Sequence, residues 1–396
     1  MNNYILFDEK WTDFLPLSFT RPISYFRIGI LTIKEKWELL LNADFSVKTV
    51  DYLSKKYPSI IEDKNILINS RVLPDNRLIE KIQELKLNQY IYKEDLLIAA
   101  CIDRKSTECF DSSKGEYLGE KIDYKNEIIK IDYLYDIFQK NDKALIDDFN
   151  LLTNNKISQP ISLTNRCIGE ENIYIEEGAK VEFSILNATT GPIYIGKDAE
   201  IMEGCMIRGP FSLGNHSQLK MGAKIYGPVT IGPHSRVGGE VTHSVFFGYS
   251  NKAHDGFLGH SVIGEWCNLG ADTNNSNLKN NYAEVKLWNY TQEKFISTKL
   301  QFCGLIMGDH SKCGINTMFN TGTVVGVSAN IFGAGYPRNY IPSFSWGGAH
   351  GFTIYKLDDA LKTAEIVMHR RGKRLDDIDK EILMHIFKMT EKYRHF

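Results

Sequence analysis

Residues 191–232 read GPIYIGKDAEIMEGCMIRGPFSLGNHSQLKMGAKIYGPVTIG, and the spacing within this stretch decides the fold. The pattern Gly-Pro-x-x-aliphatic-Gly begins at Gly191, Gly209 and Gly227, so each copy starts 18 residues after the one before it. Within that period an aliphatic residue recurs at every sixth position. The eight members of this series are Ile195, Ile201, Ile207, Leu213, Leu219, Ile225, Ile231 and Val237.

A period of six fits neither of the common elements alone, because a helix repeats its apolar face every 3.6 residues and a strand every two. It fits a triangular coil made of three short strands, in which each side of the triangle points one aliphatic residue inward. Stacked coils pair each other's backbone groups and share one continuous core. The sequence from about Thr189 to about Gly333 therefore predicts a left-handed parallel β-helix, or prism, of hexapeptide repeats.

The six-residue register returns further along the chain in two shorter runs. They comprise Phe257, Ile263 and Leu269, and then Met307, Cys313, Phe319, Val325 and Ile331. Between them lies Asp272–Lys299, which is rich in asparagine and shows no such register. Loops of this length in a compact domain are usually functional or disordered. We expect an ordered loop that leaves the prism.

The residues before the prism show an α/β pattern. Apolar runs predict strands at 4–7, 66–68 and 96–101, and one-sided apolar spacing predicts helices at 77–86 and 133–152. The second helix should close this domain ahead of a polar linker at 153–159.

The residues after the prism predict a tail of two amphipathic helices hinged at Gly372, which caps the open end of the prism or packs on a neighbouring subunit. The expected division is 1–155 for a nucleotidyltransferase-like α/β domain, 160–345 for the β-helix and 356–396 for the helical tail.

Composition limits the kinds of partner. The 396 residues carry a formal net charge of −2, so the bulk charge does not suggest nucleic acid. The sequence has no signal-like start and no apolar run of roughly 20 residues, which favours a cytoplasmic protein without membrane contact. Seven scattered cysteines without metal-ligand spacing are expected to be buried free thiols.

The segment 249–260 interrupts the repeat and gathers chemically active side chains. Lys252, His254, Asp255 and His260 fall within nine residues. Because side chains fill a prism of this kind, any site must lie on its outer faces or between chains. A single histidine is more often a structural residue than a functional one, but His254 lies roughly one coil before the asparagine-rich loop. Both segments could therefore meet on one surface.

These residues also carry a resemblance to a known family. Lys252-Ala253-His254, followed by Phe257-Leu258-Gly259, Asn268-Leu269-Gly270-Ala271 and Asn277, resembles the acetyltransferase domain of bifunctional glucosamine-1-phosphate acetyltransferase / N-acetylglucosamine-1-phosphate uridyltransferases. Leu15-Pro16-Leu17 and Thr20-Arg21-Pro22 resemble the sugar nucleotidyltransferase domain of the same enzymes. The resemblance covers most of the chain in the family's order of domains.

The resemblance implies acetyl transfer from acetyl-CoA to an amino-sugar phosphate, coupled to uridylyl transfer from UTP, by a homotrimer with sites shared between neighbours. It implies that His254 is the catalytic base, helped by Asn268 and Asn277, and that Gly270 and Ala271 contact the cofactor. An imidazole, with an ordinary pKa of about 6.5, can accept the proton of the attacking amine.

Some positions depart from the family or follow from charge and proximity alone. Phe257 replaces a tyrosine and is expected to contact the substrate, and Lys279 is expected to contact the cofactor. Candidates for binding the sugar phosphate, chosen by charge and proximity, are Lys220, Lys224, Arg236 and Lys252.

The N-terminal domain departs further. Its loop at 6–11 contains no glycine to hold phosphates through backbone N–H groups, and Asn69-Ser70-Arg71 stands where the family has a magnesium-binding Gly-Asp. If nucleotide binds here, Arg21 would engage its phosphates, and Asp8 with Asp13 would share a magnesium ion. The alternative is that Arg21 pairs with a carboxylate and the domain only supports the prism.

Three other functions remain open from the sequence. An acyltransferase of the same fold could act on a different sugar or amine, and a non-catalytic scaffold would explain the missing glycine loop. A zinc hydratase would need three converging histidines, for which His243, His254, His260 and His310 are spaced poorly.

Overall fold

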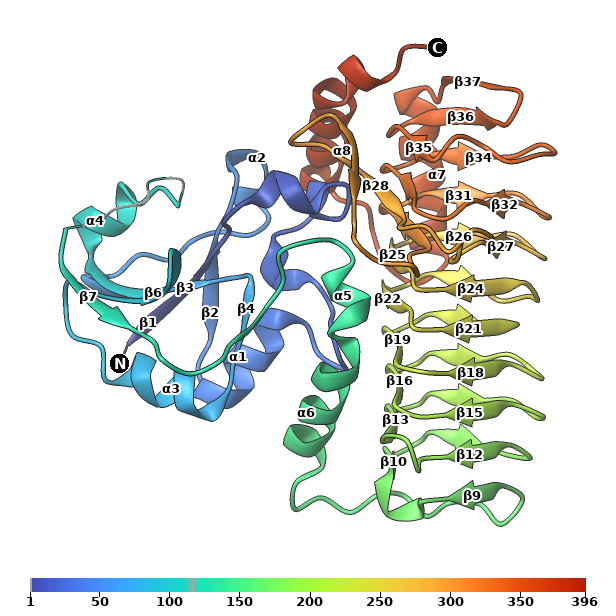
Figure 1. Ribbon diagram of the computed structural model, residues 1–396, viewed down its shortest axis with the longest axis horizontal. Coiled ribbons are helices and arrows are strands. Elements are labelled where there is room, and N and C mark those ends of the chain that lie inside the picture. The colour runs from blue at the N-terminus through green and yellow to red at the C-terminus, as the bar shows by residue number, and fades with distance from the viewer. Residues whose placement is uncertain (1, 113, 115–117) are drawn as a thin grey trace. The chain divides into compact units, whose positions relative to one another are not determined.

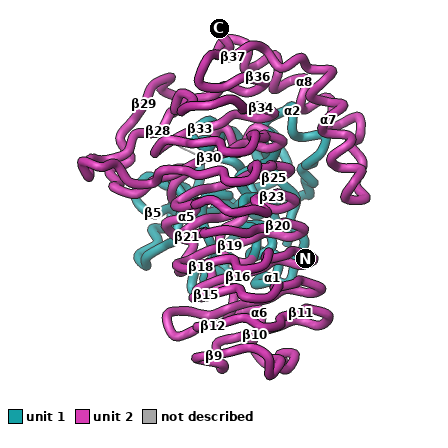
Figure 2. Tube along the Cα trace, turned by 90° about the vertical axis from the view of Figure 1, so that its right-hand side faces the viewer, with its two compact units in different colours: residues 1–14, 20–26, 31–132 teal, residues 15–19, 27–30, 133–396 magenta. Residues whose placement is uncertain are grey.

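The computed structural model describes residues 2–112, 114 and 118–396. It contains two compact units, coloured separately in Figure 2. Unit 1 comprises residues 1–14, 20–26 and 31–132, and unit 2 comprises residues 15–19, 27–30 and 133–396.

Unit 1 is built on a six-stranded sheet with the order β2-β1-β3-β6-β5-β7. Its strands are β1 (Asn3–Phe7), β2 (Phe45–Lys48), β3 (Lys64–Asn69), β5 (Gln89–Lys93), β6 (Leu96–Asp103) and β7 (Glu120–Asp123). The strands β2, β1 and β3 run parallel, and β6 runs antiparallel to both of its neighbours. The three strands expected from apolar runs are thus confirmed as β1, β3 and β6, which are buried on both faces.

Short helices and a small ribbon complete unit 1. They are α1 (Ile33–Leu41), α2 (Asp51–Ser54), α3 (Asn76–Gln83), α4 (Arg104–Glu108), and the strand pair β4 (Val72–Leu73) with β8 (Ile129–Lys130). Helix α1 begins at a capping box, in which Thr32 and Glu35 satisfy each other's backbone N–H groups. Helix α3 confirms the predicted amphipathic helix but ends earlier than expected.

Unit 2 contains the predicted prism, drawn as stacked coils in Figure 1. The chain winds through three faces in turn. The first face holds β9 (Arg166–Ile168), β12 (Ile185–Asn187), β15 (Met206–Arg208), β18 (Lys224–Tyr226), β21 (Glu240–Thr242) and β24 (Phe257–Gly259), followed on later coils by β27 (Asn274–Asn275) and β32 (Met318–Phe319).

The second face holds β10 (Ile173–Ile175), β13 (Ile193–Ile195), β16 (Phe211–Leu213), β19 (Val229–Ile231), β22 (Val245–Gly248), β25 (Val262–Glu265), β30 (Leu305–Met307), β33 (Thr323–Val325) and β35 (Tyr340–Ile341). The third face holds β11 (Lys180–Val181), β14 (Glu200–Ile201), β17 (Gln218–Leu219), β20 (Arg236–Val237), β23 (Asn251–Lys252), β26 (Asn268–Leu269), β31 (Lys312–Cys313), β34 (Asn330–Ile331), β36 (Ser345–Gly348) and β37 (Gly351–Ile354). We call the corners between faces the 1–2, 2–3 and 3–1 corners.

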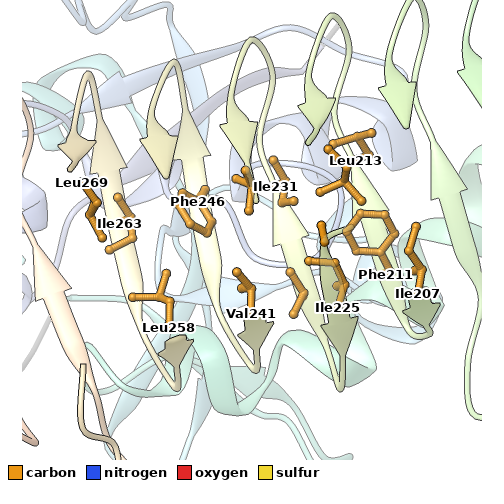
Figure 3. Packing of buried hydrophobic residues seen from close by; sticks show 14 of the residues in the cluster. Ile207, Phe211, Leu213, Ile225, Ile231, Val241, Phe246, Leu258, Ile263 and Leu269 are labelled. Carbon is orange, nitrogen blue, oxygen red and sulfur yellow. The ribbon is translucent and has the colours of Figure 1, made fainter. Parts of the chain in front are cut away.

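The interior of the prism confirms the predicted register. All eight residues from Ile195 to Val237 in the six-residue series are at most 2% exposed. Figure 3 shows how side chains from successive coils pack in this interior. Because each coil contacts only its neighbours, these stacked aliphatic residues form the core.

The register shifts after Val237, and one prediction is therefore wrong. The next interior residue is Val241, only four positions later, because the turn at Gly238 and Gly239 is short. As a result Leu258, and not Phe257, points into the prism and pairs with Val241. Ile263 and Leu269 are interior as predicted.

The asparagine-rich segment is ordered, as expected, but it leaves the prism later than its composition suggests. Asn275 still occupies an interior position, where its side chain bonds both the N–H and the carbonyl of Gly259. An amide in place of an aliphatic residue hid this repeat. Beyond it, β28 (Lys286–Asn289) and β29 (Lys294–Ser297) form an antiparallel hairpin.

The predicted helix at 133–152 is interrupted and forms two helices, α5 (Asp136–Gln139) and α6 (Asn141–Thr153). The break lies at Lys140, and the Asn141 side chain at the start of α6 accepts a hydrogen bond from Thr230 on β19 at 3.1 Å. This contact places α6 against the second face of the prism.

The tail confirms the predicted pair of helices, α7 (Leu357–His369) and α8 (Asp377–Met389), beside the later coils in Figure 2. Arg371 after α7 donates to Asn251 on the third face at 2.8 Å. Phe387 of α8 packs edge-on against Phe344, with ring centroids 5.0 Å apart. The last strand of the prism, β36, pairs with the antiparallel strand β37.

Two general expectations can be compared with the structure. Among the described residues, no helix combines the length and apolar character needed to cross a bilayer. All seven cysteines are free thiols, but Cys109 is exposed and Cys167 is half-buried, so the expectation of burial is wrong for these two.

Candidate functional site

His254 lies at the 3–1 corner with its side chain exposed. The turn that carries it is tied to the next coil, because the N–H of Asp272 donates to the carbonyl of Asp255 at 3.0 Å. Gly270 and Ala271 belong to that next coil and precede Asp272 directly. The structure therefore brings His254, Gly270 and Ala271 to one corner of the prism on adjacent coils.

The coil before His254 offers little bulk at this corner, because it turns through Gly238 and Gly239. Gly239 has a φ of +71°, and a Cβ atom there would lie 2.8 Å from the carbonyl oxygen of Gly256 and 2.9 Å from Nζ of Lys252. A side chain at position 239 would therefore be strained and would displace the turn of His254. The two glycines thus let the turn of His254 pack closely on the coil before it.

Lys252 was expected to bind the sugar phosphate, and the structure contradicts this. Its side chain is 1% exposed and points into the prism. Its Nζ atom donates to the carbonyl oxygens of Gly238 at 3.1 Å and His254 at 2.9 Å. Burial lowers the pKa of Lys252 to about 8, although the nearby carboxylates of Asp255 and Asp272 raise it. Lys252 holds the turn of His254 from inside and cannot meet a ligand on the surface.

Arg236 and Asn268 lie two coils apart on the third face, with Asn251 between them, and line one pocket. This pocket has a volume of about 320 Å³, and helix α7 and the residues after it form its other wall. It is lined by Arg236, Tyr249, Asn251, Trp266, Cys267, Asn268, Lys312, Val367, Arg370 and Arg371.

Asn277 lies at a different corner from His254. Its Nδ2 atom is 2.9 Å from Nδ1 of His260, at the 1–2 corner where the strands of the first face end. The imidazole of His260 stacks on that of His243 with centroids 4.5 Å apart. Burial and the neighbouring His243 lower the pKa of His260 to about 4, so this pair is neutral at pH 7. The pocket beside it has a volume of about 510 Å³.

Lys279 also lies on the side of the 1–2 corner. It lines a pocket of about 530 Å³ together with Lys286, Arg338, Phe295 and Tyr340. Two lysines and an arginine beside aromatic rings suit a ligand that combines phosphate groups with a flat ring.

The other predicted substrate contacts are spread over the prism. Lys224 is exposed on the first face, and Phe257 is half-buried on the same face. The N–H of Phe257 donates to the Asn274 side chain at 2.7 Å. Lys220 lies at the 3–1 corner two coils before His254, where its Nζ donates to Gln218 at 3.2 Å.

Unit 1 has its own pocket at the carboxyl ends of β1 and β2. It has a volume of about 330 Å³ and is lined by Phe7, Asp8, Lys10, Trp11, Lys48, Thr49, Val50, Asp51, Phe110, Asp111 and Ser112. In open α/β sheets, ligands bind at this end of the parallel strands. Its two lysines and its aromatic rings give it the character of a nucleotide site.

Of the three predicted nucleotide contacts, only Asp8 lines this pocket. Its carboxylate accepts hydrogen bonds from the hydroxyl of Thr49 at 2.6 Å and the N–H of Ile23 at 3.1 Å. Burial raises the pKa of Asp8 to about 7, although its hydrogen bonds with Thr49 and Ile23 lower it. Asp13 and Arg21 lie outside the pocket lining, and Arg21 is 6% exposed.

Arg71 occupies the position at which the family resemblance implied a metal-binding acid. Its guanidinium is buried, donates to Glu9 at 2.6 Å and pairs with Asp132. These carboxylates are thus engaged by an arginine. Besides Asp8, the acids that line the pocket are Asp51 and Asp111, and Mg²⁺ takes one or two carboxylates together with substrate phosphates.

Sequence reasoning missed Arg370 and Arg371. Their only signal was a pair of arginines directly after an amphipathic helix. Nothing in the order of residues indicates that this helix docks on the third face beside Arg236.

The sequence is similar to those of known proteins. Residues 4–157 match the family model described as sugar nucleotidyl transferase. The chain is 27% identical over 311 residues to a bifunctional sugar-1-phosphate nucleotidylyltransferase/acetyltransferase of Sulfurisphaera tokodaii, which covers 77% of this chain and 69% of the relative. It is also 36% identical over 87 residues to the bifunctional protein GlmU of Methanocaldococcus jannaschii, or 22% of this chain and 21% of that protein.

Among solved structures, an Arabidopsis UDP-N-acetylglucosamine acyltransferase aligns with 54% of this chain and 80% of its own. The identity is 13% and the TM-score is 0.26, which is too low to bear on function.

Proposed function

Because the chain is homologous to bifunctional sugar-1-phosphate nucleotidylyltransferase/acetyltransferases, we propose that its prism transfers the acetyl group of acetyl-CoA to the amine of glucosamine 1-phosphate. The observation that carries this proposal is the position of His254. Its imidazole is exposed at a corner where its turn packs closely on Gly239 of the coil before and is tied to the coil of Gly270 and Ala271 after it. A buried amine holds its turn in place.

The chemistry needs a base because an amino sugar is largely protonated at neutral pH. In the proposed reaction the neutral amine attacks the thioester carbonyl, and His254 accepts the proton that the nitrogen loses. The tetrahedral intermediate then collapses, the C–S bond breaks, and the proton passes to the departing thiolate of CoA. General base catalysis of this kind contributes roughly 10²- to 10⁴-fold. An amide donor such as Asn268 would stabilise the oxyanion by about 3 kcal/mol.

Exposed apolar residues mark a path for CoA along the 3–1 corner. Ile315 is 70% exposed and Phe332 is 41% exposed, and both follow Ala271 on later coils of this corner. The N–H of Asn316 donates to the carbonyl of Ala271 at 2.8 Å, which makes the two turns neighbours. The pantetheine arm would lie on this apolar path with its thioester at His254.

The proposed assembly is a homotrimer with each site shared between two chains. The first face carries exposed apolar side chains on its early coils, which is typical of an interaction surface. They are Ile168, Ile185, Met206 and Tyr226. If three first faces surround a threefold axis, the 3–1 corner of each prism meets the 1–2 corner of the next. That arrangement would bring Asn277 and the Lys279 pocket of one chain to His254 of its neighbour.

The test is release of free thiol from acetyl-CoA in the presence of glucosamine 1-phosphate. His254→Ala should lower kcat by at least about 100-fold. His350→Ala, which removes another exposed imidazole, is the matched control and should retain wild-type activity. More than a tenth of wild-type activity in His254→Ala would remove His254 from the mechanism.

A second activity, uridylyl transfer from UTP to N-acetylglucosamine 1-phosphate, is proposed for unit 1. Its support is the match of residues 4–157 and the lysine-lined pocket at the ends of β1 and β2. Lys10 and Lys48 would bind the triphosphate, and Asp51 and Asp111 would hold a magnesium ion, which neutralises phosphate charge when bound. Release of pyrophosphate is the assay. Lys48→Met should abolish it and leave thiol release unchanged.

A further inference from the structure

The pocket under helix α7 concentrates positive charge. Arg236 extends from β20, and Arg370 and Arg371 follow α7. Burial lowers the pKa of Arg371, and the nearby guanidinium groups of Arg236 and Arg370 lower it further. Within the described part of the chain, none of the three forms an ion pair with a carboxylate, and Arg371 instead donates to the amide oxygen of Asn251. The fold thus holds three like charges around one cavity.

The other walls of the pocket suit a small polar ring. Tyr249 and Trp266 stack with centroids 4.3 Å apart and form an aromatic wall. The amides of Asn251 and Asn268 lie on neighbouring strands, with Nδ2 of Asn251 3.4 Å from Oδ1 of Asn268. The faces of these two rings are covered by each other and by His234 and His310, which continue the stack. The ligand contacts therefore come from the amides, which bond hydroxyl groups, and from the guanidinium groups, which bind phosphate bidentately.

The pocket is also connected to the corner of His254. Asn251 precedes His254 by three residues, and Asn268 precedes Ala271 by three residues on the next coil. Three residues of strand span at most about 10 Å. The phosphate and the amine of the proposed acceptor are on adjacent carbons, C1 and C2, so the acceptor would lie at the end of the pocket nearest the corner and the imidazole side chain would span most of that distance. The volume of about 320 Å³ is at the small end of ligand pockets, which favours a sugar phosphate over the much larger CoA.

We infer that this pocket binds the phosphate of the amino-sugar phosphate acceptor, and that the C-terminal tail supplies two of its three phosphate-binding arginines. The inference rests on the proposed acetyl transfer for the identity of the sugar. It assigns the phosphate contact to Arg236, Arg370 and Arg371, so the tail is part of the acceptor site in the same chain.

Calorimetric titration of the full-length protein with glucosamine 1-phosphate tests the inference directly. Arg236→Met and Arg370→Met should each weaken binding by at least about tenfold, because each removes a charge-assisted hydrogen bond to phosphate. Glucosamine without phosphate should bind the wild-type protein at least as weakly as glucosamine 1-phosphate binds the two arginine variants. Lys362→Met, on an exposed residue of α7, is the matched control and should bind like wild type.

Acetyl-CoA should be titrated in the same way, because its phosphates could occupy the same pocket. Its affinity should be unchanged in both arginine variants. Loss of acetyl-CoA affinity with unchanged acceptor affinity would overturn the inference, and so would wild-type acceptor affinity in both variants. Arg236 is on a strand, so Arg236→Met is informative even if substitution after α7 loosens the tail. Thermal melting confirms that each variant is folded.

The outcome is separable from that of the proposed function. His254→Ala should bind glucosamine 1-phosphate as tightly as wild type if the arginines hold the phosphate. Arginine-dependent binding without any thiol release would support the pocket and refute the acetyl transfer. Thiol release with an acceptor KM that does not change in Arg236→Met and Arg370→Met would support the acetyl transfer and refute the pocket.

Discussion

Nζ of Lys252 donates a hydrogen bond to the carbonyl oxygen of His254 at 2.9 Å, from inside the prism to its outer corner. A second bond to Gly238 at 3.1 Å ties the same amine to the coil before. Aliphatic or apolar residues occupy the equivalent positions on neighbouring coils, at Val237 and Leu269. A buried ammonium is costly to desolvate, so its place here is best explained by the turn it holds.

Lys252→Met should separate the position of the base from the stability of the fold. Methionine fills similar space without a charge, so we expect a melting temperature at least equal to that of wild type. The turn of His254 loses its internal support, so kcat for thiol release should fall by about tenfold or more while the KM for acetyl-CoA changes little. Lys180→Met, on an exposed residue, serves as control. Unchanged kcat would show that Lys252 has no positioning role.

The same lysine should give the wild-type protein a pH-dependent stability. Because the pKa of Lys252 is about 8 in the folded chain and 10.5 ordinarily, the unfolded chain binds more protons between these values. The free energy of unfolding should therefore rise with pH from about 8 to about 10.5. Denaturant melts across this range should show a smaller rise for Lys252→Met. Parallel curves for the two proteins would refute this.

Asp8 should make the free energy of unfolding fall with rising pH, whereas Lys252 makes it rise, and it should do so at lower pH. Burial raises its pKa from 3.8 to about 7, so the folded chain binds more protons than the unfolded chain between these values. The free energy of unfolding should therefore fall as the pH rises from about 4 to about 7, because the buried carboxyl must lose its proton. Asp8→Asn should raise the melting temperature of unit 1 at pH 8 but not at pH 4. A rise of the same size at pH 4 and at pH 8 would contradict this.

Neighbouring residues on β15 should respond in opposite ways to a charge. Ile207 points into the prism, whereas Met206 is exposed on the first face. Ile207→Asp places a carboxylate in a dry core, which costs on the order of 5 kcal/mol, and should greatly reduce the β-sheet signal in circular dichroism. Met206→Lys should retain that signal. A folded Ile207→Asp protein would mean that the series does not face inward.

Met206→Lys also tests the proposed trimer. A charge in the exposed apolar part of the first face should dissociate the assembly, because an interface disfavours an unpaired charge at its centre. Sedimentation velocity should then detect monomers. Ile366→Lys, on an exposed apolar residue of α7, is the control and should sediment like wild type. Wild-type sedimentation of Met206→Lys would exclude this face as the interface.

The prism could be predicted from the sequence because its repeat makes every interior position equivalent. One aliphatic residue at each sixth position specifies both the coil and the direction of its side chain. The prediction failed where that equivalence is broken, at the short turn after Val237 and at the polar interior residues Lys252 and Asn275. Charge alone placed Lys252 on the surface, since nothing in its local sequence shows that the register continues through it.

The candidate site was only partly accessible from the sequence. His254 and Ala271 could be connected because adjacent coils bring residues one repeat apart to the same corner. Asn277 lies at the 1–2 corner beside His260 instead, because β27, which crosses the first face, separates it from Ala271 at the 3–1 corner. Arg370 and Arg371 could not be assigned, because their position depends on how a distant helix docks on the prism.

The reversal between β36 and β37 determines how the molecule can associate. A stack of parallel coils ends in a strand whose free edge could accept another coil and extend into a fibre. Here that edge is paired with a strand of opposite direction, and Phe352 of β37 turns into the core beside Phe396 at the end of the chain, with ring centroids 6.0 Å apart. The third face therefore cannot continue the parallel stack of coils at this end, which disfavours growth of the prism by addition of a further parallel coil.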